Sequence, residues 1–399
     1  MHIQKNLKLI DAYTLGTNML FMLPIVIPYY RDQIGLGFRE FLLGEAAFSA
    51  TIVLLDVPTG WISDVWQRKH TQALGILFEI FGFSLLVFAS NLLMAVSSQI
   101  LIGIGISLCS GTNTAILYDS LLSVGREKEY RRREGRRQAF GFYTVAVSSI
   151  LGGLVYPLHH QLPLVFGVIA MTAALIASCM LDEPERHKRI PERHPLADIL
   201  ETIKYALHGH AEIGFIILSA AALFCSTKLI MWSQQPDYMM LKVPEAWYGI
   251  LMAVGFMLGG MSSHSSHLLD GRIKPVHALV IFWTLGVLVC LGAAVQPGWH
   301  GVALLMFGGT CLFGMASPRF NEVINRNIDS ARRATVLSTQ NLMVSLLFIP
   351  LSTLMGLLSR HWGVQAVLIG LAAWLCVSGT ALGLLALSRR RSSARGFPR

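Results

Sequence analysis

The chain has 399 residues, of which 53% are hydrophobic and only 14% charged, and its mean hydropathy is +0.55. Soluble globular domains carry about 25% charged residues, so this composition excludes an ordinary soluble protein. A net charge of +9 would favour a nucleic-acid partner in a soluble chain, but here the basic residues fall in short connections between apolar runs.

Apolar runs recur along the whole chain, each close to the roughly 20 residues that a helix needs to cross a bilayer. We therefore predict an all-α polytopic membrane protein with twelve transmembrane helices and no soluble domain. The predicted spans are 9–30, 41–62, 71–90, 95–118, 138–158, 162–181, 212–235, 245–263, 275–295, 301–318, 334–357 and 364–388.

The basic residues are unequally divided between the two sides of this arrangement. With the N-terminus inside, the inner connections and tails hold 27 of the 32 lysines and arginines. This asymmetry predicts that both termini are cytoplasmic. The runs REKEYRRREGRR and RRRSSARGFPR are suited to contact with anionic membrane lipids.

A polar stretch near the middle of the chain separates two halves of six spans each. Apolar residues between Leu196 and Leu207 recur at helical spacing, which predicts an amphipathic helix on the membrane surface. Paired halves around a central loop are typical of secondary transporters with internal repeats. The predicted parts are a bundle 1–181, the loop 182–211, a second bundle 212–388 and a basic tail 389–399.

Span 1 carries Asn18, Met22, Ile25 and Tyr29 at helical spacing, which predicts one mixed polar and apolar helix face. Such a face either contacts a substrate or forms hydrogen bonds between helices.

Three carboxyl groups fall within predicted spans: Glu45 and Asp56 in span 2, and Glu79 in span 3. A charged side chain at the bilayer centre costs about 2.5–3.5 kcal/mol on insertion scales, so these groups are candidates for reversible protonation and coupling to protons. Glu45 is alternatively near enough to the outer headgroups to reach them, and Asp56 is near enough to the inner end to belong to a gate.

The connection after span 2, DVPTGWISDVWQRK, has Gly60, Asp64, Arg68 and Lys69 at fixed spacing. It resembles the signature loop of the major facilitator superfamily, with Gln67 in place of the usual glycine. Both its lead-in and the segment SGTNTAILYDSL, residues 110–121, are similar to a bacterial efflux branch of that superfamily.

The resemblance implies a protein of a bacterial inner membrane, with two six-helix bundles that move by alternating access around a central site lined by spans 1, 4, 7 and 10. It also implies an inner gate, in which Asp64 faces the start of span 11 near Arg332 and Arg333 while Arg68 pairs with Asp119. Gly60 is expected to permit a close helix contact. The alternative is an ordinary charged loop that follows the positive-inside rule.

Span 5 contains SSILGG, residues 148–153, where proton-coupled drug antiporters of the superfamily usually have a Gly-Pro pair before the two final glycines. The small residues still predict a closely packed seam, but the serines weaken the antiporter interpretation.

Span 7 contains Lys228, with Phe224, Trp232 and Gln235 on the same helix face. An ammonium between aromatic rings suits an anionic organic molecule. The alternatives are an ion pair with Glu45 or Asp237, or a lysine that extends to the membrane surface. Further candidate substrate contacts are Asn113, Asn341 and Ser345.

No metal site, cofactor or enzyme activity is expected, since no phosphate-binding loop or nucleophilic constellation is present in the sequence. His264 and His267 are explained by a polar helix end. We therefore predict a monomeric secondary transporter that exports a small amphiphilic anion, such as a drug or a siderophore, in exchange for protons. The alternatives are an importer of a polar nutrient and a receptor that does not transport.

Overall fold

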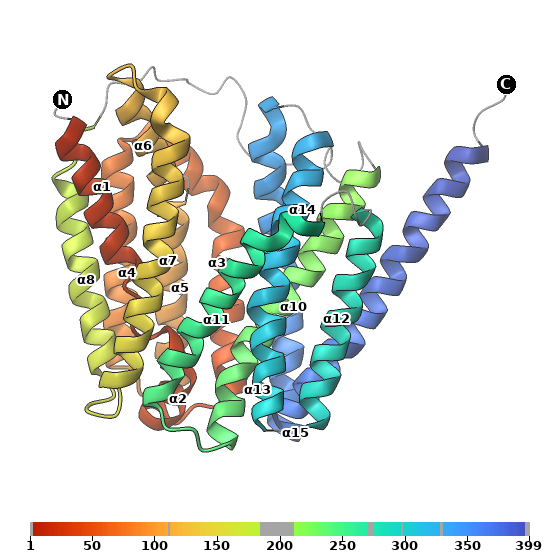
Figure 1. Ribbon diagram of the computed structural model, residues 1–399. Helices are drawn as coiled ribbons and strands as arrows, with labels where there is room; N and C mark the ends of the chain where they lie inside the picture. The colour runs from red at the N-terminus through yellow and green to blue at the C-terminus, as the bar shows by residue number, and fades with distance from the viewer. Residues whose placement is uncertain are drawn as a thin grey trace. The chain divides into compact units, whose positions relative to one another are not determined.

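A computed structural model describes residues 3–110, 112–183, 211–269, 275–296, 298–327 and 330–395. Every regular element within these ranges is a helix, and Figure 1 labels them. Ten helical segments in the described part of the chain are long and apolar enough to cross a membrane. The predicted all-α, multi-pass membrane fold is therefore confirmed.

Two elements account for the difference between ten segments and the twelve predicted spans. Helix α3 (Phe38–Val65) is outside the ten, although its 28 residues exceed the length that a span requires. Helix α15 (Ser330–Arg395) runs through spans 11 and 12, but Gly363 within it has a non-helical φ of 77°. Adding α3 and dividing α15 at Gly363 gives twelve.

The prediction of one continuous helix over span 1 is wrong. The first helix, α1, ends at Asn18, and the chain continues through short helical turns. Pro24 and Pro28 lie in these turns, and proline lacks the N–H group that a continuing helix requires. The elements are α1 (Ile3–Asn18), η1 (Leu23–Ile25), α2 (Val26–Tyr29) and η2 (Tyr30–Ile34).

The chain divides into two compact units, which do not follow the sequence halves at every point. Unit 1 is Met1–Leu196 with Val243–Val254, and unit 2 is Ala197–Lys242 with Gly255–Arg399. The segment Val243–Val254 falls in the second sequence half but packs with the first. The amphipathic helix predicted between 196 and 207 lies outside the described residues.

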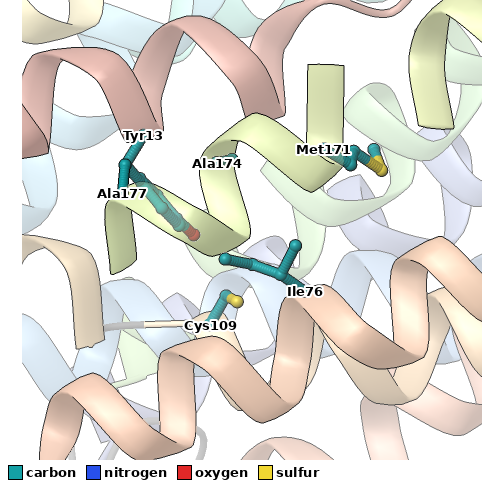
Figure 2. Close-up of a cluster of buried hydrophobic side chains, with 6 residues drawn as sticks. All are labelled: Tyr13, Ile76, Cys109, Met171, Ala174 and Ala177. Carbon is teal, nitrogen blue, oxygen red and sulfur yellow. The ribbon is translucent and has the colours of Figure 1, made fainter. Parts of the chain in front are cut away.

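Unit 1 is built around α4, which packs against α5 and α8, while α1 packs against α8. Glycines let these helices approach closely: a Cβ added at Gly75 would lie 2.8 Å from the carbonyl oxygen of Gly105. Figure 2 shows the buried cluster where α1, α4, α5 and α8 meet, formed by Tyr13, Ile76, Cys109, Met171, Ala174 and Ala177. The further helices of unit 1 are α4 (Arg68–Val87), α5 (Leu92–Cys109), α6 (Thr112–Leu122), η3 (Glu127–Glu129), α7 (Tyr130–Val155) and α8 (Leu162–Cys179).

Unit 2 is organised around α10, which packs against α14 and α15. A π-helical turn, η6, joins α13 to α14, and such turns often occur at functional sites. Its helices are α10 (Ala211–Met240), η5 (Ser265–Leu269), α12 (Pro275–Val295), α13 (Trp299–Met306), η6 (Phe307–Cys311), α14 (Leu312–Asn327) and α15. Helix α11 (Ala246–His264) is divided between the units, since its residues up to Val254 belong to unit 1 and those from Gly255 belong to unit 2.

Candidate functional site

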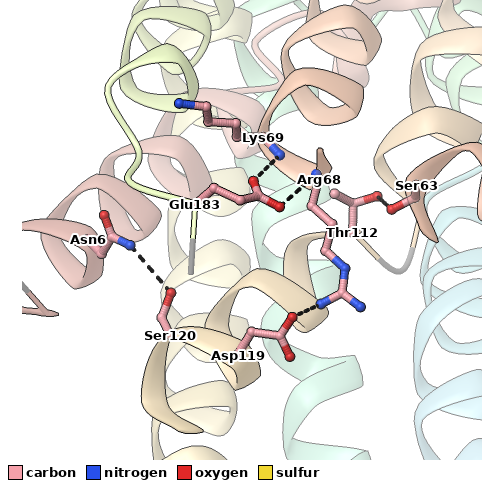
Figure 3. A network of polar contacts seen from close by, with 8 residues as sticks. All are labelled: Asn6, Ser63, Arg68, Lys69, Thr112, Asp119, Ser120 and Glu183. Atoms are coloured by element: carbon pink, nitrogen blue, oxygen red, sulfur yellow. Dashed lines mark hydrogen bonds and ion pairs between the residues drawn. The ribbon is translucent and has the colours of Figure 1, made fainter. Parts of the chain in front are cut away.

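The start of α4 forms the first part of the candidate site. Helix α3 ends at Val65, two residues in extended conformation follow, and α4 begins at Arg68. The guanidinium of Arg68 forms an ion pair with the carboxylate of Asp119 on α6, as the family resemblance implied (Figure 3). Each side chain is 17% exposed, so the pair is largely withdrawn from solvent. It ties the loop between α3 and α4 to the end of α6.

A second acid at this loop, Glu183, follows α8 and was not predicted from the sequence. Its carboxylate accepts hydrogen bonds from the backbone N–H of Arg68 at 3.0 Å and of Lys69 at 2.9 Å (Figure 3). These are the first N–H groups of α4, which have no partner within the helix, and the helix dipole favours an anion there. The Lys69 ammonium donates to the carbonyl of Leu181 at 3.4 Å. Glu183 therefore acts as the N-terminal cap of α4.

Further polar contacts join other helices at the same end of unit 1. The Asn6 side chain, fully buried at the start of α1, donates to the hydroxyl of Ser120 at 3.4 Å and to the carbonyl of Asp182 at 2.8 Å. The hydroxyl groups of Ser63 and Thr112 lie 3.0 Å apart (Figure 3). The ends of α1, α3, α4, α6 and α8 are thus held in one network.

The close helix contact expected at Gly60 is not found in the described part of the chain. A Cβ added there would meet no described atom within 4 Å. The contact between α3 and α5 is made instead by the preceding residue, because the Thr59 hydroxyl donates to the carbonyl of Ser107 at 2.9 Å. The side chains of Asp64, Arg332 and Arg333 lie outside the described part, so their predicted contact stays a prediction.

The three carboxyl groups of the predicted spans have different surroundings. Glu45 is 7% exposed and lies within electrostatic range of the Tyr30 hydroxyl. Asp56 is half-buried and lies near Ser110. Glu79 is 7% exposed and lies inside unit 1 beside Cys109. None of the three lies on a wholly exposed surface, although their roles in proton coupling stay predictions.

The break in span 1 separates the residues predicted to share a helix face, which is a further correction. Asn18 is the last residue of α1, and its side chain donates to the carbonyl of Thr14 at 2.8 Å. Met22 lies in the turn that follows and is buried. The hydroxyl of Tyr29 donates to the carbonyl of Leu86 at 3.2 Å. Tyr29 therefore forms a bond between segments of unit 1, and the three residues do not form one helix face.

Lys228 in α10 is the central feature of unit 2. Its ammonium lies 4.0 Å from the centroid of the Phe348 ring of α15, which is a cation–π geometry. Phe224, one turn earlier in α10, packs edge-on against Phe313 and Phe320 of α14. An ammonium and four aromatic rings from α10, α14 and α15 thus belong to one unit. This arrangement is suited to an organic anion with an apolar body.

The other predicted substrate contacts lie in both units. Trp232 and Gln235 of α10 are buried, whereas Asn341 is exposed and Ser345 half-buried on α15. Asn113 of α6 accepts a hydrogen bond from the side chain of Gln72 at 2.6 Å. The structure thus places Asn113 in a polar contact inside unit 1.

The seam predicted at SSILGG is present. A Cβ added at Gly153 would lie 2.8 Å from the backbone nitrogen of Gly249 in α11, and one added at Gly152 would collide with the carbonyl oxygen of Phe21. The two glycines therefore allow α7 to pack directly against two neighbouring backbones.

The sequence profile of the Major Facilitator Superfamily matches residues 12–353. The chain belongs to this superfamily. The match covers most of both units and agrees with the signature loop, the ion pair between Arg68 and Asp119, and the number of spans. The protein is therefore a multi-pass membrane transporter. No curated protein sequence matches the chain significantly.

Solved structures of the superfamily share the fold. A variant of the nucleoside transporter NupG is 14% identical with a TM-score of 0.82, covering 96% of this chain and 99% of its own. A bacterial homologue of the human lysosomal transporter Spinster, in an inward-facing and unoccupied conformation, is 16% identical with a TM-score of 0.70, covering 96% and 95%. A POT family transporter in complex with 5-aminolevulinic acid is 13% identical with a TM-score of 0.69, covering 97% and 96%.

Several residues of the candidate site were missed from the sequence. Phe348, Phe313 and Phe320 were read as ordinary span residues, since nothing local distinguishes an aromatic ring beside a lysine from one that faces lipid. Glu183 gave a weak signal, because it is an acid directly after an apolar span. Helix α4 has no acidic residue in its own first turn. No local signal indicated that Tyr13 and Cys109 would lie next to Glu79.

Proposed function

We propose that this superfamily member is a secondary transporter that exports a small amphiphilic, anionic organic compound by proton-coupled alternating access. In this proposal the protein alternates between conformations that open the substrate site to one side of the membrane or the other, and the free energy comes from the proton gradient. The protein acts as a monomer in a bacterial inner membrane, with both termini in the cytoplasm.

The observation that carries the proposal is the position of Lys228 inside α10, with its ammonium 4.0 Å from the Phe348 ring. A positive charge within a membrane-spanning helix is costly, and such residues are usually functional. An anion bound there would gain charge pairing in a site of low polarity, and the rings of Phe224, Phe313 and Phe320 would receive an apolar body. Trp232, Gln235, Asn341 and Ser345 are proposed as further contacts.

We propose that Glu45, Asp56 and Glu79 bind and release the coupled protons. Each is a carboxyl within or near the hydrocarbon depth, where gain or loss of a proton changes the cost of burial. Gly60, Asp64, Arg68, Lys69, Asp119, Arg332 and Arg333 are proposed to hold the inner gate.

An importer of a polar nutrient is the second candidate function. Two observations favour it: Ser148 and Ser149 replace the Gly-Pro pair of proton-coupled drug antiporters, and one similar structure is that of a nucleoside transporter. The aromatic rings near Lys228 favour an amphiphile over a hydroxyl-rich nutrient.

The test is proton release from inverted vesicles that contain the protein, with deoxycholate as an anionic amphiphile and tetraphenylphosphonium as a cationic one. The variants are Lys228→Ala, Lys228→Arg and Phe348→Leu. We expect proton release with the anion, at least a tenfold loss in Lys228→Ala, and substantial retention in Lys228→Arg. Phe348→Leu should reduce release by a smaller factor, because it leaves the charge in place.

The outcomes separate the candidates. A response to the cation that survives in Lys228→Ala would contradict an anionic substrate. Silence with both compounds, together with uptake of a nucleoside or sugar by right-side-out vesicles, would establish the importer. Transport in neither direction and with no compound class would favour a receptor that keeps the fold.

A further inference from the structure

Glu79 is a buried carboxyl group of unit 1, with 7% of its surface exposed. It lies on α4, eleven residues after Arg68, which corresponds to about 16 Å along the helix and hence to the middle of the membrane. Its side chain passes over Gly105 of α5, where a Cβ would lie 2.5 Å from the Glu79 Cγ. Glycine at position 105 is therefore what leaves room for this carboxyl.

Two other ionisable side chains adjoin Glu79. Cys109 of α5 lies beside Glu79 and beside Tyr13 of α1, close enough for each pair to interact. The Cys109 thiol also donates to the backbone carbonyl of Gln72 at 3.6 Å. Glu79, Cys109 and Tyr13 are 7%, 7% and 3% exposed, and Ile76, Met171, Ala174 and Ala177 pack around the thiol and the phenol (Figure 2). These three groups form a small polar cluster in an apolar core.

A series of polar side chains connects the cluster to the loop between α3 and α4. Tyr13 lies beside Asn113, whose side-chain oxygen accepts a hydrogen bond from Gln72 at 2.6 Å. The other atom of the Gln72 amide accepts from Ser178 at 2.8 Å, and Ser178 reaches the carbonyl of Lys69 at 3.4 Å. Lys69 is the residue whose N–H is held by Glu183. Side chains from α1, α5, α6 and α8, together with those of α4 itself, thus form one path between Glu79 and the start of α4.

The charged and titratable groups around this cluster are few in the described part of unit 1. Helix α5 contributes Cys109 and α1 contributes Tyr13. Arg137 of α7 lies within electrostatic range of Tyr13 and is itself paired with Glu134 at 2.7 Å. The faces of α8 in the cluster are apolar. Because Arg137 is already matched by Glu134, a charge on Glu79 would depend on hydrogen bonds for its stabilisation.

We propose that Glu79, Cys109 and Tyr13 form a proton-binding site inside unit 1, in which the charge state of Glu79 selects the hydrogen-bond acceptor of the Cys109 thiol. When Glu79 is protonated, its hydroxyl donates to the Cys109 sulfur and the thiol donates to the Gln72 carbonyl. When Glu79 loses its proton, the carboxylate becomes an acceptor only, and the thiol turns to it and leaves Gln72. One proton is exchanged and no bond between heavy atoms changes.

This change of acceptor would affect the loop between α3 and α4. The Gln72 side chain forms hydrogen bonds with Asn113 of α6 and with Ser178 of α8. Loss of the thiol from the Gln72 carbonyl would therefore affect α6 and α8 at the end of the unit where Arg68 and Lys69 are held. This inference rests on the proposed proton coupling and selects one of its three carboxyl groups.

The experiment is infrared spectroscopy of the full-length protein in nanodiscs, recorded as a function of pH without substrate. A protonated buried carboxyl gives its own C=O stretching band. We expect a titrating band that is lost in Glu79→Gln, shifted in frequency in Cys109→Ala and Tyr13→Phe, and unchanged in the control Glu40→Gln. Glu40 lies in the first turn of α3, away from this cluster. If Glu79→Gln does not fold, Glu79→Asp should keep a band at a shifted frequency.

A titrating band that persists unchanged in Glu79→Gln, or one that Cys109→Ala leaves unshifted, would overturn the proposal. Because the measurement needs no transported compound, it separates the two claims. Silence in the vesicle assay with a band that depends on Glu79 would refute proton-coupled export alone. Proton release in vesicles without such a band would refute the Glu79 site and leave Glu45 or Asp56 to carry the proton.

Discussion

Replacing Gly16 by alanine is expected to force α1 away from α8. A Cβ at this position would lie 2.5 Å from the carbonyl oxygen of Ala170 and 2.8 Å from the Cβ of Ala174. Ordinary contacts begin at 3.4 Å, so the two helices must separate by 3.4 − 2.5 = 0.9 Å. Neither neighbour is the end of a flexible side chain that could rotate out of the way.

The expected cost follows from this rigidity. Overpacking of a well-packed core costs about 1–3 kcal/mol, and a backbone neighbour places Gly16→Ala near 2 kcal/mol. For a unit of about 200 residues, each kcal/mol lowers Tm by roughly 2–4 °C, so the expected fall is roughly 4–8 °C. Part of the cost is offset because alanine is the better helix former.

The assay is thermal unfolding of the purified variants in one detergent, followed by the fluorescence of a thiol-reactive dye. Gly167→Ala, in α8, is the matched control, because a Cβ there would meet no described atom within 4 Å. We expect the control to leave Tm unchanged or slightly raised. A Gly16→Ala variant whose Tm equals that of Gly167→Ala would refute the close approach of α1 and α8.

Two further predictions concern charged groups of unit 1. A double-mutant cycle of Arg68→Ala and Asp119→Ala should give a coupling free energy of about 1–3 kcal/mol. This value lies between those of exposed and buried ion pairs, because each side chain is 17% exposed. Strictly additive changes in the free energy of unfolding would contradict a stabilising pair. Burial, and then the charge of Asp32, raise the pKa of Glu245 in the connection before α11 above its ordinary 4.5. The stabilising contribution of Glu245 is therefore present at low pH and is lost as the pH rises through the folded-state pKa. In the unchanged protein Tm should fall above pH 4.5, and Glu245→Gln should make this fall less steep. An equally steep fall in the variant would contradict the raised pKa of Glu245.

The architecture was predictable because the bilayer imposes one length and one polarity on every span. The errors arose where local chemistry interrupts that pattern. Span 1 was read through Pro24 and Pro28 as one helix, since its apolar spacing continues across them. Close contact was assigned to Gly60, whereas Gly75 and Gly105 make such a contact in unit 1. With 36 glycines in the chain, the sequence does not show which ones meet another backbone.

The candidate site was predictable only where a motif fixed both partners. The pair of Arg68 and Asp119 followed from the family resemblance. Glu183 and Phe348 did not, because their partners are 115 and 120 residues away and packing alone brings them together. Lys228 was found from its own chemistry, as a cation inside an apolar span, but its ring neighbour could not be named.

Helix α4 links the two polar regions of unit 1 through its own geometry. At 3.6 residues per turn, positions 68, 72 and 79 fall on one face, since four and eleven residues are close to one and three whole turns. Arg68 and Gln72 contact α6 and α8 on that face, and Glu79 continues it into the core. Ile76 interrupts the polar face between Gln72 and Glu79, and side chains from α1, α5 and α6 bridge the gap. A displacement that breaks this bridge therefore requires α1, α5 or α6 to move relative to α4, so the proposed proton site and the start of α4 are coupled through the packing of these helices.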